Sequence, residues 1–231
     1  MRQTPLTVVR GMRRSVLTGL LAFTGVAAWP AVAEAAPVAT WPMAADANDT
    51  TGGHDGVAEN IDFSSGAAFF SGNNSRITVP FSTGLSPGAA NVTATVEINT
   101  TAVPGTGTDD FDLMRASPTG KMYKVELFPR KRIAQAQCVF IGTVTRLSVH
   151  AGPALNDGQW HTIRCTKTAN QVTLTVLTDG AVVASSSTNI TIGSITLKKN
   201  SIFALGYKPV IGQPDEDRYK GQMRNASVSI G

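Results

Sequence analysis

The sequence predicts an all-β protein, an antiparallel sandwich of two sheets, preceded by a helical export signal. Short segments in which apolar and polar residues alternate recur from residue 38 to the end, with turn-forming residues between them. Over the same residues, no window places apolar side chains at the i, i+3, i+4, i+7 spacing of an amphipathic helix. Strands with one apolar face need a second sheet to cover it, so this many segments favours a sandwich.

Residues 1–35 have the three parts of an export signal. Arginines come first, an apolar stretch from Val16 to Ala28 follows, and small residues close the segment. The apolar stretch is shorter than the roughly 20 residues of a membrane-spanning helix, which makes an uncleaved anchor the alternative. We therefore expect this segment to be removed on export.

The cleavage site and the export route each have two readings. Cleavage after Ala35 satisfies the small-residue rule, and so does cleavage after Ala33. The pair Arg13-Arg14 ahead of a mildly apolar core also suggests the twin-arginine route beside the general one. In either case the mature protein is expected to be one domain over residues 37–231.

Composition and charge narrow the class of protein. A chain that is 42% hydrophobic and 16% charged lies far from the composition of disordered proteins. The chain has 20 basic and 16 acidic residues, and residues 1–35 hold four of the basic ones and one of the acidic ones. The remainder is close to neutral, so a nucleic-acid partner is not expected, because such binding needs many Lys and Arg side chains.

The only two cysteines, Cys138 and Cys165, are spaced unlike metal ligands. In an oxidising exterior such a pair is expected to form a disulfide. Two buried free thiols are the alternative.

The strands are expected in the order of the alternating segments, and Asp179-Gly180 is typical of a type I′ hairpin turn that would pair 172–177 with 182–187. The clearest segments are Arg76–Val79, Val92–Ile98, Phe111–Arg115, Lys121–Phe128, Gln137–Ile141, Thr145–Val149, Trp160–Lys167, Val172–Leu177, Val182–Ser187, Ser201–Leu205 and Ala226–Ile230.

Three stretches together resemble the laminin G-like domains of the concanavalin A-like lectin/glucanase superfamily. These are residues 68–72 continuing to 76–80, the run Asn-Asp-Gly-Gln-Trp-His-Thr-Ile at 156–163, and Tyr-Lys-Gly-Gln-Met-Arg-Asn at 219–225. Gln222 departs from the pattern, since many extracellular animal members have a cysteine there. The resemblance implies a jelly-roll β-sandwich, in which Cys138 and Cys165 must bridge other strands.

The resemblance implies only a general function, because such sandwiches serve as glycan binders, adhesion modules and accessory domains. We expect a secreted, non-catalytic, lectin-like module that recognises carbohydrate or a cell-surface polymer through loops at the sandwich rim. An extracellular structural or protein-interaction domain is the first alternative, and a polysaccharide hydrolase or lyase is the second.

The residues give little support for catalysis. The Glu-x-Asp-x-Glu strand of sandwich glycosidases is absent, Glu97 and Glu126 stand alone in their strands, and 215–217 is an acidic loop run. Neither a Gly-x-Ser-x-Gly elbow nor a zinc-ligand spacing of histidines occurs.

Candidate ligand-binding residues come from the 208–218 loop. Tyr207 and Tyr219 flank it and are expected to be exposed for stacking on a sugar ring, and Asp215 and Asp217 add carboxylates. Trp41 and Trp160 are instead expected in the core.

Two further features each have a functional and a structural reading. Laminin G-like sandwiches often hold calcium at a loop rim, and the aspartates in loops are Asp46, Asp49, Asp109, Asp110, Asp215 and Asp217. The sequence does not choose among them. A basic cluster surrounds a hairpin whose turn Pro129 should mark, either to bind sulfated polysaccharide or to keep a sheet edge soluble. It comprises Lys121, Lys124, Arg130, Lys131 and Arg132.

Overall fold

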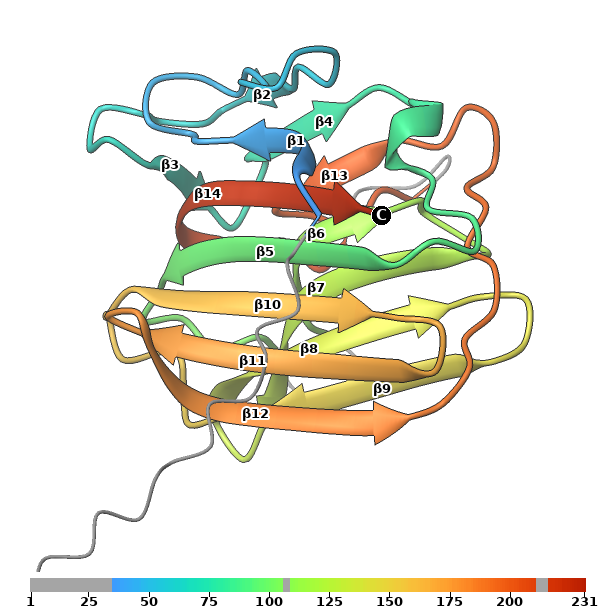
Figure 1. Cartoon of the computed structure of the whole chain (residues 1–231). Helices are drawn as coiled ribbons and strands as arrows, with labels where there is room; N and C mark the ends of the chain where they lie inside the picture. Colours follow the sequence, from blue (N-terminus) through green and yellow to red (C-terminus); the bar gives the residue numbers. More distant parts are fainter. Residues whose placement is uncertain (1–34, 106–108, 211–215) are drawn as a thin grey trace, which may run out of the picture. The chain divides into compact units, whose positions relative to one another are not determined.

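The strands are arranged in two facing antiparallel sheets (Figure 1). The computed structural model describes residues 35–105, 109–210 and 216–231. The first sheet has the order β1 (Pro37–Trp41), β14 (Lys220–Ile230), β5 (Val92–Asn99), β10 (His161–Lys167), β11 (Gln171–Thr178) and β12 (Ala181–Asn189), and β3 (Ala68–Ser71) also pairs with β14. The second sheet has the order β2 (Val57–Glu59), β4 (Arg76–Val79), β13 (Phe203–Leu205), β6 (Phe111–Ala116), β7 (Met122–Arg130), β8 (Ile133–Ile141) and β9 (Arg146–Ala151).

The predicted all-β sandwich is confirmed. Strand β10 shows how alternation makes the core, because Ile163 and Cys165 are buried between the sheets whereas Thr162 and Arg164 alternate with them on the other face. Within the described residues, the single-turn η1 (Thr83–Leu85) is the only helix assigned, and no helix there is long and apolar enough to cross a membrane.

The expected disulfide is present and joins the two layers. Cys138 of β8 and Cys165 of β10 are bonded, with their Cα atoms 5.7 Å apart. The bridge therefore links the second sheet to the first through the core.

Two hairpin turns were predicted, and one of them was misplaced. Asp179 and Gly180 take φ values of 49° and 77°, and β11 pairs with β12 as expected. In the basic hairpin, Lys131 and Arg132 form the turn, with φ values of 49° and 71°. Pro129 lies inside β7, opposite Ala134 of β8, so the prediction that Pro129 marks the turn is wrong.

The pairing of β6 with β7 positions the candidate site. Tyr123, Val125 and Leu127 of β7 face the core, so Lys124 and Glu126 between them face the other side of the sheet. The register of β6 against β7 places Asp112 opposite Glu126. A β-bulge between Asp112 and Met114 then interrupts the pairing, which continues from Met114.

Candidate functional site

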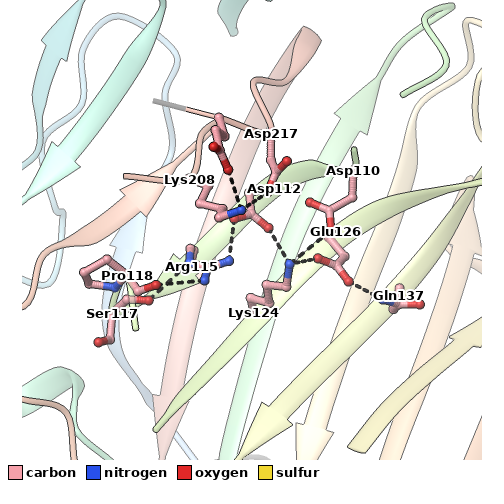
Figure 2. A network of polar contacts seen from close by, with 11 residues as sticks. Asp110, Asp112, Arg115, Ser117, Pro118, Lys124, Glu126, Gln137, Lys208 and Asp217 are labelled. Carbon is pink, nitrogen blue, oxygen red and sulfur yellow. Dashed lines mark hydrogen bonds and ion pairs between the residues drawn. The ribbon is translucent and has the colours of Figure 1, made fainter. Parts of the chain in front are cut away.

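A buried ammonium group joins three carboxyl groups on the outer face of the second sheet. Lys124 Nζ lies 3.0 Å from Asp112 Oδ1 and 3.2 Å from Asp110 Oδ2, and it also contacts Glu126 (Figure 2). The Lys124 side chain is only 9% exposed. These charges are thus shielded from water, and their mutual attraction is stronger than on an open surface.

Neighbouring donors hold two of these carboxylates from other directions. Arg115 Nη1 donates to Asp112 Oδ2 at 2.8 Å, and the same guanidinium donates to the carbonyls of Ser117 and Pro118. The side-chain amide of Gln137, on β8, donates to Glu126 Oε1. Adjacent strands therefore build the cluster together (Figure 2).

The segment before β14 closes over the cluster. Lys208 Nζ lies 2.7 Å from Glu216 Oε2 and 3.2 Å from Asp217 Oδ2. The backbone N–H of Asp112 donates to the carbonyl of Asp217 at 3.0 Å. These contacts fix the Asp217 carboxylate beside those of Asp110 and Asp112.

Burial and like charges keep protons on this cluster. Burial, together with the charges of Asp112 and Glu126, raises the pKa of Asp110 to about 9, although Lys124 opposes the shift. Burial likewise raises the pKa of Glu126 and of Asp217. Burial lowers the pKa of Lys124, but the three surrounding carboxyls outweigh it and raise that pKa overall. Asp110 is therefore protonated at neutral pH while Lys124 is charged.

A shared proton also explains a carboxyl oxygen that otherwise has no hydrogen-bond donor. Buried Asp110 Oδ1 accepts no hydrogen bond from the described residues, whereas Glu126 Oε2 contacts Lys124 Nζ. A side-chain hydrogen bond between Asp110 and Glu126 raises the pKa of Asp110. A proton held between the two carboxyls removes one negative charge and satisfies both groups.

An open pocket of about 330 Å³ adjoins this cluster. It lies where the segment after β3, the start of β6 and the segment before β14 meet, and it is lined by Gly72, Gly105, Asp109, Asp110, Phe111, Glu216, Asp217 and Arg218. Such a volume is at the lower end for small-ligand sites, which are commonly about 300–1,000 Å³. The lining carries four acidic side chains, one arginine and one aromatic ring.

Of the three candidates from the 208–218 loop region that the structure describes, only Asp217 lines the pocket. Asp215 is outside the described residues. Tyr207 is 3% exposed and its hydroxyl lies 2.7 Å from Thr78 Oγ1; Tyr219 is 0% exposed. The Tyr219 hydroxyl donates to main-chain carbonyls of the neighbouring strands. The prediction that both tyrosines are exposed is wrong, because each ring packs inside the domain.

Two residues that looked unremarkable in the sequence are central to the cluster. Glu126 was expected to be isolated, but the register of β6 against β7 brings Asp112 opposite it. Lys124 was assigned to an exposed basic cluster, yet it is buried among carboxyls. Two sequence patterns could have indicated the cluster: Asp-x-Asp at 110–112 and Lys-x-Glu at 124–126. In extended backbone each of these spacings places its two charged side chains on the same face.

The two predicted core tryptophans differ. Trp41 is 0% exposed and stacks on Phe203, with ring centroids 5.3 Å apart. Trp160 is only half-buried, and the Arg224 guanidinium lies 4.0 Å from its ring centroid. The prediction of a core position is therefore correct for Trp41 and wrong for Trp160.

The carboxylates of Asp110, Asp112 and Asp217 present oxygens within 4.8 Å of one another, which is close enough to share a cation. Lys124 already contacts two of the three groups, and Lys208 contacts the third. Lysine ammonium groups thus already pair with all three carboxylates, and these three residues do not fit a calcium site as they stand.

Comparison with known proteins agrees with the fold. A family model described as Laminin G domain matches residues 121–230, whereas no curated protein matches the chain. Domain 4 of an extracellular arabinanase from Geobacillus stearothermophilus, solved in complex with arabinotriose, is similar over 86% of this chain and 94% of its own, with 16% identity and a TM-score of 0.59.

Two further solved structures are longer than this chain. The botulinum neurotoxin serotype D binding domain is similar over 84% of this chain and 47% of its own, with 12% identity and a TM-score of 0.60. Domains LG4-5 of the mouse laminin alpha1 chain are similar over 71% of this chain and 40% of their own, with 19% identity and a TM-score of 0.50. Residues 121–230 thus match the Laminin G domain model, and the sandwich shares the fold of laminin domains LG4-5.

Proposed function

We propose that the protein is a secreted binding module that recognises carbohydrate, or a carbohydrate-bearing cell-surface polymer, in the pocket beside Asp110. The observation that carries the proposal is the pocket itself, an open cavity of about 330 Å³ lined by four acidic side chains and Arg218. Ligand sites combine such a concave shape with a few fixed polar groups.

The chemistry of the lining suits a sugar. Carboxylates accept hydrogen bonds from sugar hydroxyls, and the Arg218 guanidinium offers donors to ring and hydroxyl oxygens. Ion pairs with Lys208 hold Glu216 and Asp217 in place, which reduces the ordering that a ligand would otherwise have to impose.

Three observations support an extracellular binding role. The similar arabinanase domain was solved with arabinotriose, and the similar neurotoxin segment is a binding domain. The Cys138–Cys165 disulfide suits an oxidising compartment. We infer that residues 1–35 direct export, which N-terminal sequencing of the secreted protein would test through a start near Ala36.

The experiment is a glycan-array screen of the purified protein, followed by calorimetry with arabinotriose and with any array hit. Asp109 is exposed and lines the pocket, so Asp109→Asn should weaken binding about tenfold, or 1.4 kcal/mol, with little loss of stability. Asp179→Asn, in the exposed β11–β12 turn, is the matched control and should bind normally. Absence of binding on the array and in calorimetry, or equal binding by Asp109→Asn, would count against this site.

A polysaccharide hydrolase is the second candidate, because the pocket contains a carboxyl that is protonated at neutral pH. Asp110 has a pKa near 9 and one of its oxygens lies within 4.8 Å of an Asp217 oxygen, and retaining glycosidases pair an acid with a carboxylate about 5–5.5 Å away. New reducing ends from polysaccharide, abolished by Asp110→Asn, would favour this candidate over simple binding.

A further inference from the structure

A serine, a histidine and an aspartate from separate segments form a hydrogen-bonded chain away from the pocket residues. His54 Nε2 lies 3.0 Å from Ser82 Oγ, and His54 Nδ1 lies 3.1 Å from Asp49 Oδ2. Asp49 and His54 come from the β1–β2 connection, and Ser82 lies between β4 and η1. Both distances are within the hydrogen-bond reach expected of a nucleophile, its base and the group that orients the base.

Asp49 is built to orient the imidazole. Its side chain is 0% exposed, and Oδ1 accepts hydrogen bonds from Thr40 N, Thr51 N and Thr51 Oγ1 at 2.8, 2.9 and 2.7 Å. Burial raises the pKa of Asp49, but these donors together with His54 outweigh it and hold that pKa below its usual value. The carboxylate is therefore ionised at neutral pH, with Oδ2 left for the histidine.

The contact with Asp49 sets the direction of one hydrogen bond. An ionised carboxylate only accepts, so His54 donates to Asp49 from Nδ1. To act as a base the ring must be neutral, and in that form Nε2 accepts a hydrogen bond from the Ser82 hydroxyl. The Trp41 indole N–H, which donates to the His54 carbonyl at 2.7 Å, fixes the backbone of this histidine.

Ser82 lies beside two exposed residues, Thr83 and Gly84. Gly84 N donates to Ser82 Oγ at 3.1 Å, and only a glycine fits there without a shift, because a Cβ would be 3.0 Å from His54 Nε2. Ser82 also lines a small apolar cavity of about 10 Å³ with Phe81, Leu85 and other apolar residues. A cavity of this size has room for a group about as large as one water molecule or a methyl.

We propose that Ser82, His54 and Asp49 form an acyl-transfer site that hydrolyses short-chain esters of the acetyl class. The Ser82 hydroxyl gives its proton to His54 Nε2 as Oγ bonds to the ester carbonyl carbon. The carbon–oxygen bond to the alcohol breaks, and the alcohol leaves with that proton. Water then attacks the acetyl-serine, again through His54, which releases acetate and restores the Ser82 hydroxyl. Ser82 and His54 are catalytic residues, and Asp49 is a positioning residue.

The first test is covalent labelling of the purified protein with diisopropyl fluorophosphate, followed by peptide mass spectrometry. The expected result is one adduct per molecule on Ser82, lost in His54→Gln, and unchanged in Thr83→Ala, which removes a neighbouring exposed hydroxyl. A folded protein whose Ser82 stays unmodified would overturn the proposal, whatever the variants do.

The second test is the hydrolysis of p-nitrophenyl acetate and p-nitrophenyl octanoate. Acetate should be preferred, and Ser82→Ala and His54→Gln should each lower kcat at least about 100-fold while keeping the circular dichroism of the parent. Asp49→Asn should lower kcat with KM little changed, because the substrate does not touch Asp49. Equal rates in the parent and in Ser82→Ala would overturn the proposal. Glycan binding at the pocket is measured separately, so either result stands without the other.

Discussion

Two buried aspartates, Asp49 and Asp110, have opposite electrostatic environments in the same domain. The Asp49 side chain is 0% exposed and that of Asp110 is 12% exposed. Main-chain and hydroxyl donors around Asp49 lower its pKa, whereas burial among other carboxyls raises the pKa of Asp110 to about 9. Burial alone therefore does not decide protonation; the balance of donors against like charges does.

The difference follows from where each aspartate lies. Asp49 lies in the β1–β2 connection, and main-chain N–H groups of β1 and of that connection donate to one of its oxygens. Asp110 lies immediately before β6, and the groups that shift its pKa are side chains of β6 and β7. The donors around Asp49 keep its carboxylate ionised, whereas Asp110 shares one lysine with Asp112 and Glu126 and retains its proton.

The largest expected effect comes from removing the central cation of the Asp110 cluster. Lys124→Met leaves Asp112 and Glu126 buried without their ammonium partner, which should cost about 3–5 kcal/mol of unfolding free energy. Lys121→Met removes a nearby charge outside the cluster and is the control. Urea unfolding of both variants measures this, and equal stabilities would mean that the cluster is not energetically coupled.

The next effect is on the Asp49 side. Asp49→Asn replaces charge-assisted acceptors by weaker ones and should cost about 1.5–3 kcal/mol at pH 7. Because the folded pKa is depressed, this stabilisation is present above the unfolded pKa near 3.8 and is lost as pH falls below it. The stability gap between the variant and the parent should therefore narrow in thermal melts as the pH is lowered below 3.8, and a constant gap would contradict the lowered pKa.

The stability contributed by Asp110 should depend on pH in the opposite direction. The Asp110 carboxyl keeps its proton up to about pH 9 in the folded state, whereas the unfolded chain releases it near pH 3.8. Its contribution to the stability of the fold is therefore fully present below pH 3.8 and is lost as the pH rises to about 9. Asp110→Asn has no proton to lose and should be more stable than the parent by about 1 kcal/mol at pH 8. Thermal melts at pH 4, 6 and 8 should show the advantage growing with pH.

The smallest effect sharpens the contrast between buried and exposed charges. Arg76 and Glu59 form an ion pair at 2.8 Å, but their side chains are 39% and 44% exposed. Glu59→Gln should cost only about 0.2–1 kcal/mol, and less at high salt. A loss as large as that of Lys124→Met would mean that burial is not what distinguishes the cluster.

The sequence predicted the scaffold better than the sites, for a physical reason. Alternation is local, so β4 and the β11–β12 hairpin were found from their own residues, whereas β2, at three residues, was too short to stand out. Sites depend on register: Glu126 meets Asp112 only because β7 pairs with β6. His54 meets Ser82 across 28 positions of chain, which no local motif indicates.

The most direct test of this account is a carbon-13 NMR titration of the aspartate side-chain carboxyls in the folded protein. Asp110 should change protonation near pH 9, and Asp49 should do so below pH 3.8. Asp110→Asn and Asp49→Asn assign the two signals. Titration of both carboxyls together near pH 4 would contradict the account, because the two environments would then be electrostatically alike.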